Sequence, residues 1–358
     1  MKKRVLVLTS RMGGGHESVA QALVDYIKSK QIATVKKVDL MREANKMVEA
    51  IWVQTYKTQV SATPTIYDAI YELAREDITG GIDGFFKLFL YKALRGVYEK
   101  FRPDTIIITH PFQVPPTSRL KQKINPDLQI IEVVTDFEPH SLHVNDSIDK
   151  YIVASDFTKH VLIARGMPAD KIFTYGIPVR MEFTKEIPTK NESESLRLLV
   201  LGGSLGTPEI KSTVRQILSD DSRNVTVVVV CGRNRYLKKT MEQTYSTDAR
   251  VTVKGFVDNV CELMDWADVV VTKPGGLTIT EAIYRQKPLL VPYSYPGQER
   301  ENLQFLLEND LVVYVKSKRK IGEVIDELIA DQSRLRTITR NLGKLRAGYS
   351  IEKILELI

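Results

Sequence analysis

The sequence has few of the features that mark secreted, membrane-spanning or metal-bound proteins. Two of its 358 residues are cysteines, Cys231 and Cys261, and neither belongs to a Cys-x-x-Cys pair or to a Cys/His spacing typical of zinc sites. Two thiols form no disulfide framework, so we expect a reducing, cytoplasmic setting. No run of 18 or more apolar residues occurs, and the sequence therefore predicts no transmembrane helix.

A cleavable leader is not expected either. The basic start, Met1 to Arg4, is followed by an apolar run of only four residues, Val5 to Leu8. A secretory signal has an apolar region of about 7–15 residues, and no Ser/Arg-rich transit segment precedes the first strand. These absences favour a bacterial protein.

The composition is that of an ordinary globular protein. Hydrophobic residues make up 43% and charged residues 27%, which excludes a disordered chain, a collagen-like fibre and a coiled-coil rod. The length predicts two domains. The formal charge of +7 is uneven, because residues 87–123 hold eight Lys or Arg and two acidic residues. Such a segment suits an anionic membrane or a phosphate, and the alternative is a solvated face. Nucleic acid, which rests on the charge alone, is not expected as a partner.

Short apolar runs alternate with helical patterns in the first half of the chain. The first run is followed by glycines and an amphipathic helix near Ser18–Lys30. Strand–helix alternation predicts a mostly parallel sheet covered on both faces. The expected strands are Val5–Thr9, Thr105–Thr109, Gln129–Val134 and Lys150–Ala154.

The polar stretch Thr184–Ser195 has the composition of an interdomain linker. After it the alternation restarts, which predicts an α/β domain over 1–183, a second over 196–340 and a C-terminal helix at 341–358. Whether that helix returns to the first domain is left open. The expected strands of the second domain are Leu196–Leu201, Val225–Val230, Val251–Lys254, Val269–Thr272, Leu289–Pro292 and Val312–Val315.

Residues 47–100 carry no strand signal and are rich in aromatic side chains. Part of the segment follows helical spacing, with Lys87, Lys92 and Arg95 among the apolar positions. A basic, aromatic, amphipathic helix can lie in a membrane interface, and the alternative is a helix that packs into the core. The helical stripe comprises Phe86, Phe89, Leu90, Ala93, Leu94 and Val97, next to Phe85.

A glycine-rich loop after the first strand ends in a histidine, Gly13-Gly14-Gly15-His16. Glycines let a ligand approach the backbone, and the start of the following helix favours an anion. The loop is neither a Gly-x-Gly-x-x-Gly nor a Walker sequence. His16 is a candidate general base or hydroxyl-orienting group, and the alternative is a turn with a surface histidine.

A second loop, Lys273 to Thr280, joins an expected strand to a helix. Backbone amides at a helix start can bind a diphosphate. Glu281, one turn further, can accept hydrogen bonds from ribose hydroxyls, although a helix-capping role is the alternative. The amides concerned are those of Gly275, Gly276, Leu277 and Thr278.

Other strand ends of the second domain carry groups suited to phosphate, a planar base or sugar hydroxyls. An arginine can neutralise phosphate, and a neighbouring amide and carboxylate can bind hydroxyls in pairs. The strand ends of α/β sheets are where ligands bind. These candidates are Gly203, Ser204, Arg233, Phe256, Val257, Gln298 and Glu299.

Polar and imidazole groups also follow the expected strand Gln129–Val134. The run is Thr135-Asp136-Phe137-Glu138-Pro139-His140, with His143 three residues further and Thr109-His110 at a neighbouring strand end. A zinc site at Asp136, His140 and His143 has only weak support from this spacing, and no metal site is expected.

In order along the chain, these motifs resemble the monogalactosyldiacylglycerol synthase and processive diacylglycerol glucosyltransferase family, within glycosyltransferase family 28. The resemblance extends from residue 4 to about 350. It implies a GT-B fold, in which two Rossmann-like domains face a cleft. The motifs are Gly-Gly-Gly-His, Thr-Asp-Phe then His140, Gly176-Ile177-Pro178-Val179-Arg180, Lys-Pro-Gly-Gly-Leu-Thr-Ile-Thr-Glu and Pro-Gly-Gln-Glu.

The resemblance implies an inverting transfer of glucose or galactose from a UDP-sugar to the 3-hydroxyl of diacylglycerol, repeated in some members. Glucose is favoured here by the bacterial setting. The resemblance also implies peripheral docking on an anionic membrane, at the inner face of the cell membrane, through the aromatic segment. It implies neither a metal ion nor another cofactor, in agreement with the lack of an Asp-x-Asp motif.

The resemblance implies roles for individual residues where this sequence matches a motif of the family. His16 and Asp136 are both candidates for the base, and the choice between them is left open. The loop from Gly275 to Thr278 matches the diphosphate site, and Glu281 matches the ribose ligand. Gln298 and Glu299 match the sugar contacts, and Gly203, Ser204, Arg233, Phe256 and Val257 complete the expected donor site. The acceptor and membrane side comprises Gly14, Gly15, His140, Phe85, Phe86 and Phe89. One departure is His143, which stands where relatives usually have tryptophan.

Three other functions are weighed. One is a family 28 transferase that uses UDP-N-acetylglucosamine on an undecaprenyl-linked peptidoglycan precursor. Another is a UDP-sugar sensor without turnover, and a third is a non-hydrolysing epimerase. The presence of His16, Asp136, Glu281 and Gln298 favours catalysis.

Overall fold

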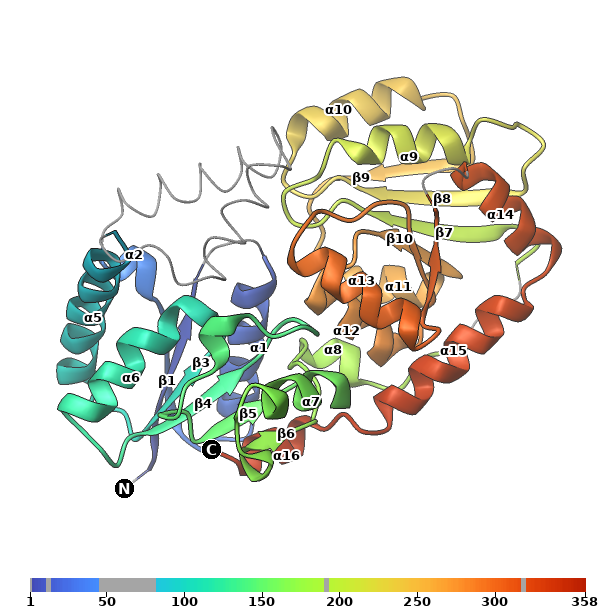
Figure 1. Cartoon of the computed structure of the whole chain (residues 1–358). Helices are drawn as coiled ribbons and strands as arrows, with labels where there is room; N and C mark the ends of the chain where they lie inside the picture. The colour runs from blue at the N-terminus through green and yellow to red at the C-terminus, as the bar shows by residue number, and fades with distance from the viewer. Residues whose placement is uncertain (1, 11–13, 45–81, 190–192, 317–319) are drawn as a thin grey trace. The chain divides into compact units, whose positions relative to one another are not determined.

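The computed structural model describes residues 2–10, 14–44, 82–189, 193–316 and 320–358. The chain divides into two compact α/β units (Figure 1). Unit 1 comprises Met1–Met181, Tyr295–Glu301 and Gly348–Ile358, and unit 2 comprises Glu182–Ser294 and Asn302–Ala347.

Unit 1 is built on a sheet of six parallel strands in the order β2-β1-β3-β4-β5-β6. The expectation of a parallel sheet is confirmed. Two strands, β2 and β6, were not expected from the sequence: β2 is half polar, and β6 has only two residues. The strands are β1 (Arg4–Thr9), β2 (Thr34–Asp39), β3 (Thr105–Ile108), β4 (Gln129–Val133), β5 (Lys150–Ile152) and β6 (Ile172–Phe173).

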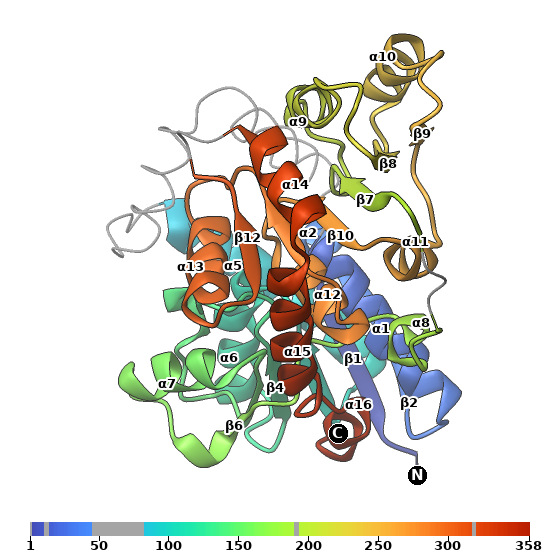
Figure 2. The same ribbon diagram turned by 90° about the vertical axis from the view of Figure 1, so that its right-hand side faces the viewer.

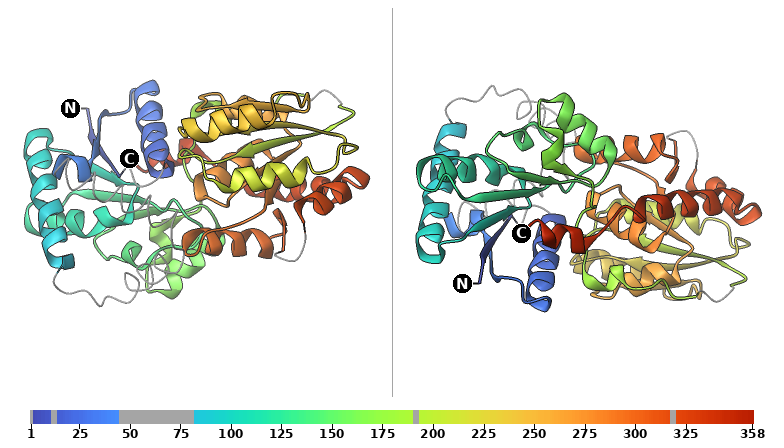
Figure 3. Two further views of the ribbon diagram at one scale, coloured as in Figure 1. Left: turned by 90° about the horizontal axis from the view of Figure 1, so that it is seen from above. Right: turned by 90° about the horizontal axis from the view of Figure 1, so that it is seen from below.

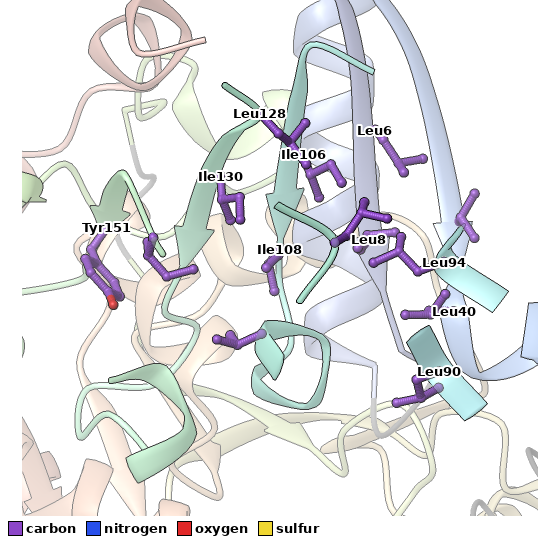
Figure 4. Packing of buried hydrophobic residues seen from close by; sticks show 14 of the residues in the cluster. Leu6, Leu8, Leu40, Leu90, Leu94, Ile106, Ile108, Leu128, Ile130 and Tyr151 are labelled. Atoms are coloured by element: carbon purple, nitrogen blue, oxygen red, sulfur yellow. The ribbon is translucent and has the colours of Figure 1, made fainter. Parts of the chain in front are cut away.

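Helices cover both faces of this sheet. Successive strand residues point to opposite faces. Leu6, Leu8, Ile106, Ile108 and Ile130 point to one of them and form a single core with residues of two helices, α5 and α6 (Figure 4). The helices of unit 1 are α1 (Gly15–Ser29), α2 (Leu40–Ala44), α5 (Ile82–Phe101), α6 (Val114–Lys123), α7 (Asp156–Ala164) and α16 (Ile351–Glu356), with short 3-10 turns η1 (Pro111–Gln113), η2 (Ser141–His143) and η3 (Ala169–Lys171).

Helix α5 corrects part of the membrane interpretation. Leu90, Leu94 and Val97 are at most 3% exposed and pack into the core of unit 1. Most of the predicted apolar stripe is therefore a core-packing face, because a parallel sheet needs a helix layer on each side. Residues 45–81 and the side chains of Phe85 and Phe86 lie outside the described part of the chain. The membrane contact expected of them therefore stays a prediction.

Unit 2 has a second sheet of six parallel strands, in the order β12-β11-β10-β7-β8-β9. This is the strand order of a Rossmann fold. Four of the expected strands have the predicted bounds, because their apolar runs stop abruptly at glycine or polar residues. The strands are β7 (Leu196–Leu201), β8 (Val225–Val230), β9 (Val251–Lys254), β10 (Val269–Thr272), β11 (Leu289–Val291) and β12 (Val312–Tyr314).

Helices α9 and α10 lie on one face of the second sheet, and α11 and α12 lie on the other (Figure 1). Helix α12 also packs against the long helix α15, as Figure 2 shows. The strands of each sheet are covered on both sides in the views of Figure 3. The helices of unit 2 are α8 (Met181–Thr184), α9 (Glu209–Ile217), α10 (Arg235–Thr244), α11 (Val260–Trp266), α12 (Gly276–Arg285), α13 (Gln298–Glu308), α14 (Ile321–Ala330) and α15 (Ser333–Arg346), of which α8 and α13 begin in residues of unit 1.

The last residues of the chain belong to unit 1. The amide of Ser350 donates to the carbonyl of Tyr175 at 3.1 Å, and the Lys150 ammonium donates to the carbonyl of Leu357 at 2.7 Å. Gly176 has a φ of +84°, and a Cβ there would come within 2.8 Å of the Tyr349 ring. The glycine of the Gly176–Arg180 motif therefore allows the C-terminal segment to pack closely on unit 1.

Candidate functional site

The first candidate site lies where the strand order of unit 1 reverses. Strands β1 and β3 are neighbours, while the chain continues from β1 outward to β2. The loops that follow two such strands diverge, and α/β sheets bind ligands at this place. The loop after β1 leads to His16, and β3 is followed by Thr109 and His110. The Thr109 hydroxyl donates to the carbonyls of Leu8 and His16, at 3.0 and 3.3 Å, so the two loops are joined here.

His16 is held in one tautomer by this junction. Its Nδ1 atom lies 2.7 Å from the carbonyl oxygen of Thr109 and 2.9 Å from the hydroxyl of Thr135. A carbonyl oxygen accepts hydrogen bonds only, so Nδ1 carries the proton. The lone pair of the neutral ring is then on Nε2, which is the nitrogen that can take a proton from a substrate.

Burial lowers the pKa of His16, and the nearby carboxylate of Asp136 acts in the opposite direction. Burial also lowers the pKa of His110 well below its usual value, and His16 adds to that effect. The two rings are 4.4 Å apart. Nδ1 of His110 accepts from the amide of Phe112 at 3.3 Å. Both imidazoles are therefore neutral at pH 7.

Strand β4, the neighbour of β3, ends at the same edge of the sheet and is followed by the Thr-Asp-Phe…His stretch. Asp136 is half-buried and close enough to His16 to act on its pKa. His140 is buried, and its Nδ1 accepts from the amide of Leu142 at 3.1 Å, which starts the turn η2. The structure thus brings His16, Asp136 and His140 to one edge of unit 1. Gly14 and Gly15 begin α1 there, and Phe89 is half-buried on α5.

His143, which stands where relatives usually have tryptophan, lies in the interior of unit 1. It is 2% exposed, and its Nδ1 lies 2.7 Å from Oε1 of Glu132, a residue of β4 that is fully buried. Sequence reasoning missed Glu132, although a lone acidic residue in the apolar run Gln129–Val134 was the available signal. Among the residues that the structure describes, no group of three or more His, Cys, Asp or Glu is arranged to hold a metal ion.

The second candidate site lies where the strand order of unit 2 reverses, between β7 and β10. The loop after β7 contains Gly203, whose φ is +67°, and a Cβ there would lie 3.6 Å from Cε of Lys273, which follows β10. The two glycine loops are therefore adjacent. Gly206 also requires glycine, because its φ is +68° and a Cβ would lie 2.1 Å from the carbonyl oxygen of Cys231.

Helix α12 begins at this point, with Gly275 as its N-cap. The Gly275 amide donates to the carbonyl of Lys273 at 3.0 Å. The amides of Gly276, Leu277 and Thr278 are the ones that a helix start leaves without a partner in the helix. A Cβ at Gly275 would have no neighbour within 4 Å, so the space in front of these amides is open.

The remaining donor-side candidates lie at neighbouring strand ends. Glu281 is 8% exposed on α12. The guanidinium of Arg233 lies over the ring of Phe256 at 4.8 Å, and Phe256 is 51% exposed, with Val257 beside it. The amide of Arg233 donates to the carbonyl of Ser204 at 3.0 Å. These contacts join the loop after β7, the loop after β8 and Phe256, which lies two residues after the end of β9.

Gln298 and Glu299 begin helix α13 and are half-buried. The carboxylate of Glu299 accepts from the amide of Tyr295 at 3.2 Å. Sequence reasoning placed both residues in the 196–340 domain, whereas Tyr295–Glu301 groups with unit 1. The adjoining Asn302 is buried and donates to the carbonyl of Pro274 at 3.1 Å, a contact that the sequence did not indicate.

Two family models cover most of the chain. The Monogalactosyldiacylglycerol (MGDG) synthase model matches residues 16–179, and the model of the glycosyltransferase family 28 C-terminal domain matches residues 197–353. A protein of Bacillus pumilus named processive diacylglycerol beta-glucosyltransferase is 31% identical over 374 aligned positions, which cover 99% of this chain and 94% of the relative. The protein of that name from Bacillus subtilis is also 31% identical, with the same coverage. The chain belongs to the monogalactosyldiacylglycerol synthase and processive diacylglycerol glucosyltransferase family.

Solved structures agree with a family 28 fold. MurG of Acinetobacter baumannii superposes with a TM-score of 0.66 at 14% identity, covering 99% of both chains. A protein of Anabaena, crystallised in complex with UDP-glucose, superposes with a TM-score of 0.57 at 14% identity, covering 99% of this chain and 97% of the other. The expected GT-B fold of two Rossmann-like domains is therefore confirmed. None of the described helices has the length and apolarity of a membrane span.

Proposed function

We propose that this family member is an inverting glucosyltransferase, which transfers glucose from UDP-glucose to the 3-hydroxyl of diacylglycerol at an anionic membrane surface, and can repeat the transfer. The observation that carries the proposal is the match over 99% of the chain to diacylglycerol beta-glucosyltransferases. The chemistry at the two sheet edges supports it.

On the acceptor side, His16 acts as the base. Its Nδ1–H bond to the Thr109 carbonyl leaves Nε2 unprotonated. Nε2 takes the proton of the acceptor hydroxyl while that oxygen attacks the anomeric carbon of the sugar. The C–O bond to UDP breaks on the opposite side, so the configuration inverts. Asp136 then stabilises the imidazolium that forms, because its charge already acts on His16.

On the donor side, the start of α12 binds the diphosphate. The amides of Gly276, Leu277 and Thr278 and the helix dipole stabilise the negative charge that develops on the leaving UDP. Glu281 binds the ribose, and Gln298 and Glu299 bind the sugar hydroxyls. Helix amides supply this stabilisation directly, so the proposal assigns no step to a metal ion or another cofactor.

Exposed basic residues of unit 1 support docking on an anionic membrane from the cytoplasmic side. Lys92 and Lys100 are exposed on α5, and Lys123 is exposed on α6. Arg95 contributes less, because Glu99 is 2.7 Å away. Each basic side chain near an anionic surface contributes about 1 kcal/mol to binding.

The test is a transfer assay with the purified full chain. Vesicles that contain anionic lipid and diacylglycerol are incubated with labelled UDP-glucose or labelled UDP-galactose, and the lipids are separated by thin-layer chromatography. Labelled glucolipid, with a second product on longer incubation, is the expected result. Product from UDP-galactose alone would correct the sugar.

The assay also separates the other functions. If neither donor labels the lipid while UDP still binds, the diacylglycerol proposal is wrong. Transfer from UDP-N-acetylglucosamine to an undecaprenyl-linked precursor would then identify a peptidoglycan enzyme. Binding without transfer to either acceptor would identify a sensor.

A further inference from the structure

Glu132 is a carboxyl group inside the apolar face of the unit 1 sheet. It lies on β4, in register with Ile108 of β3 and Tyr151 of β5. Ile130 and Val134, two positions before and after it, belong to the core cluster, so Glu132 points into that core. Its side chain is fully buried. A carboxylate in such a place needs a counter-charge or a proton.

Within the described residues, His143 makes the hydrogen bond to this carboxyl group, with Nδ1 2.7 Å from Oε1. The other oxygen, Oε2, has no hydrogen-bond partner there. Burial raises the pKa of Glu132. One proton held between the two groups leaves the pair without net charge, whether it is written as acid and imidazole or as carboxylate and imidazolium.

The pair is connected to His16 by two short paths. Three residues after Glu132, the hydroxyl of Thr135 contacts Nδ1 of His16 at 2.9 Å. His143 ends η2, which packs against η1, and η1 directly follows His110. The His110 ring is 4.4 Å from that of His16. Glu132 is thus linked along β4 to Thr135, which contacts His16, and His143 is linked through η2 and η1 to His110, whose ring neighbours that of His16.

We propose that Glu132 and His143 share one proton as a buried positioning pair, which holds η2 against β4 and acts electrostatically on His16. The inference rests on the proposed function, because His16 is the base of that reaction. Neither residue touches the substrate. The other titratable groups around the pair and His16 are His110, His140, Asp136, Tyr151 and Asp146.

The sign of the effect follows from charge. Positive charge on His143 lowers the pKa values of both His16 and His110. In the carboxylate–imidazolium form of the pair, the positive member is His143, and it is His143 that acts on His16. The pair therefore extends to lower pH the range in which His16 is unprotonated and can act as a base. Removing the ionisable group at position 143 raises the pKa of His16.

The test follows His16 directly by NMR, in full-length protein with ¹³C-labelled histidine. The chain has five histidines, so the resonances can be assigned by single substitutions. In His143→Gln, the titration midpoint of His16 is expected to rise by about 0.5 pH unit, a change of about threefold in proton affinity. The acidic limb of kcat/KM moves in the same direction.

Two controls separate charge from packing. Tyr151 donates to the carbonyl of His143 at 2.8 Å, so Tyr151→Phe loosens η2 without changing charge near neutral pH. Its His16 midpoint is expected to stay at the native value. His160 is exposed outside the cluster, and His160→Gln is expected to leave the other midpoints unchanged.

A native His16 midpoint in folded His143→Gln overturns the proposal. If that variant does not fold, Glu132→Gln is measured instead. Without the carboxylate of Glu132, His143 no longer has the counter-charge that stabilises its imidazolium form. The His16 midpoint is therefore again expected to rise, and an unchanged midpoint overturns the proposal. The NMR readout needs no turnover, so it distinguishes this failure from failure of the transferase proposal.

Discussion

Nδ1 of His16 lies 2.7 Å from the carbonyl oxygen of Thr109, and this contact determines which ring nitrogen can accept a proton. The contact joins the loops after two neighbouring strands, so the tautomer depends on the arrangement of the sheet. It also favours His16 over Asp136 as the base, because a neutral ring with its lone pair on Nε2 is prepared for proton transfer.

Replacing this ring is expected to abolish most of the transfer. His16→Gln keeps a polar side chain but removes the base, and kcat is expected to fall by about 10²–10⁴-fold. The exposed His160 provides the control, because His160→Gln is expected to be fully active in the same glucolipid assay. Full turnover by His16→Gln would instead identify Asp136 as the base.

The reaction is expected to lose rate in acid. His16 works in its neutral form, and burial places its pKa below the ordinary value of 6.5. The kcat/KM value should therefore be constant around neutral pH and fall as the pH decreases through that pKa. A rate that rises toward low pH would contradict the assignment. Vesicle binding is measured at each pH, so that weaker docking is not mistaken for loss of the base.

Gly275→Ala is expected to weaken UDP binding without weakening the fold. A Cβ at Gly275 meets no atom within 4 Å and the φ is −76°, so the substitution causes no strain. The methyl group occupies the open space in front of the α12 amides, and a tenfold rise in the Kd of UDP is expected, about 1.4 kcal/mol. Calorimetry measures the Kd, and thermal unfolding measures stability.

Gly96→Ala is the matched control for that prediction. A Cβ at Gly96 also has no neighbour within 4 Å, but the residue lies within α5 of unit 1 and is not among the donor-site candidates. Alanine is the better helix former, so a gain of about 0.5–1 kcal/mol in stability is expected, with native UDP affinity. Equal effects of the two substitutions on the Kd would show that the α12 start does not bind the diphosphate.

Arg285 is expected to be essential for the stability of unit 2. Its guanidinium is 1% exposed, and it bonds both oxygens of Asp265 at 2.8 Å and the carbonyls of Phe183 and Lys185. Arg285→Met leaves these buried acceptors without donors, and should lower the free energy of unfolding by about 3–5 kcal/mol in urea denaturation.

The comparison for Arg285 is Arg250, which pairs with Asp248 at 2.7 Å but is 21% exposed. Arg250→Met is expected to cost less than about 1 kcal/mol, because water replaces part of the interaction. Similar costs for the two variants would mean that burial of the Arg285 network does not determine its contribution.

Charge reversal on unit 1 is expected to weaken membrane docking. The double variant Lys92→Glu and Lys123→Glu changes two exposed residues of α5 and α6, and should raise the Kd for anionic vesicles at least tenfold, as about 1 kcal/mol is lost per basic group. Lys344→Glu, an exposed site on α15, should bind natively. The double variant lowers the net charge by 4 and Lys344→Glu lowers it by 2, so a loss of binding free energy half as large for Lys344→Glu in flotation assays would mean that only net charge matters.

Removal of divalent cations is expected to leave the transfer unchanged. The proposed reaction meets the charge of the diphosphate with helix amides, so an excess of EDTA should not alter kcat or KM. Loss of activity with EDTA, restored by one metal ion and not by another, would mean that a bound cation takes part in the reaction.

Much of the architecture could be read from local pattern. The runs Leu196–Leu201 and Val225–Val230 are strands with the predicted bounds, because each apolar run ends directly before a glycine or one residue earlier. Strand β2, with the sequence Thr-Val-Lys-Lys-Val-Asp, was missed because an edge strand tolerates adjacent polar residues. The stripe at Leu90, Leu94 and Val97 had two interpretations, and the spacing alone could not choose between a core and a membrane.

The sequence by itself determined the alternation of strands and helices, the glycine loops that follow strands, and the family. Each of these depends on residues that are neighbours in the chain. Only the tertiary structure decided which loops meet, because the order of strands within a sheet is set by packing between distant segments. The contact of His16 with Thr109 arises from that order, and the burial of His143 against Glu132 arises from the packing of a turn on the sheet.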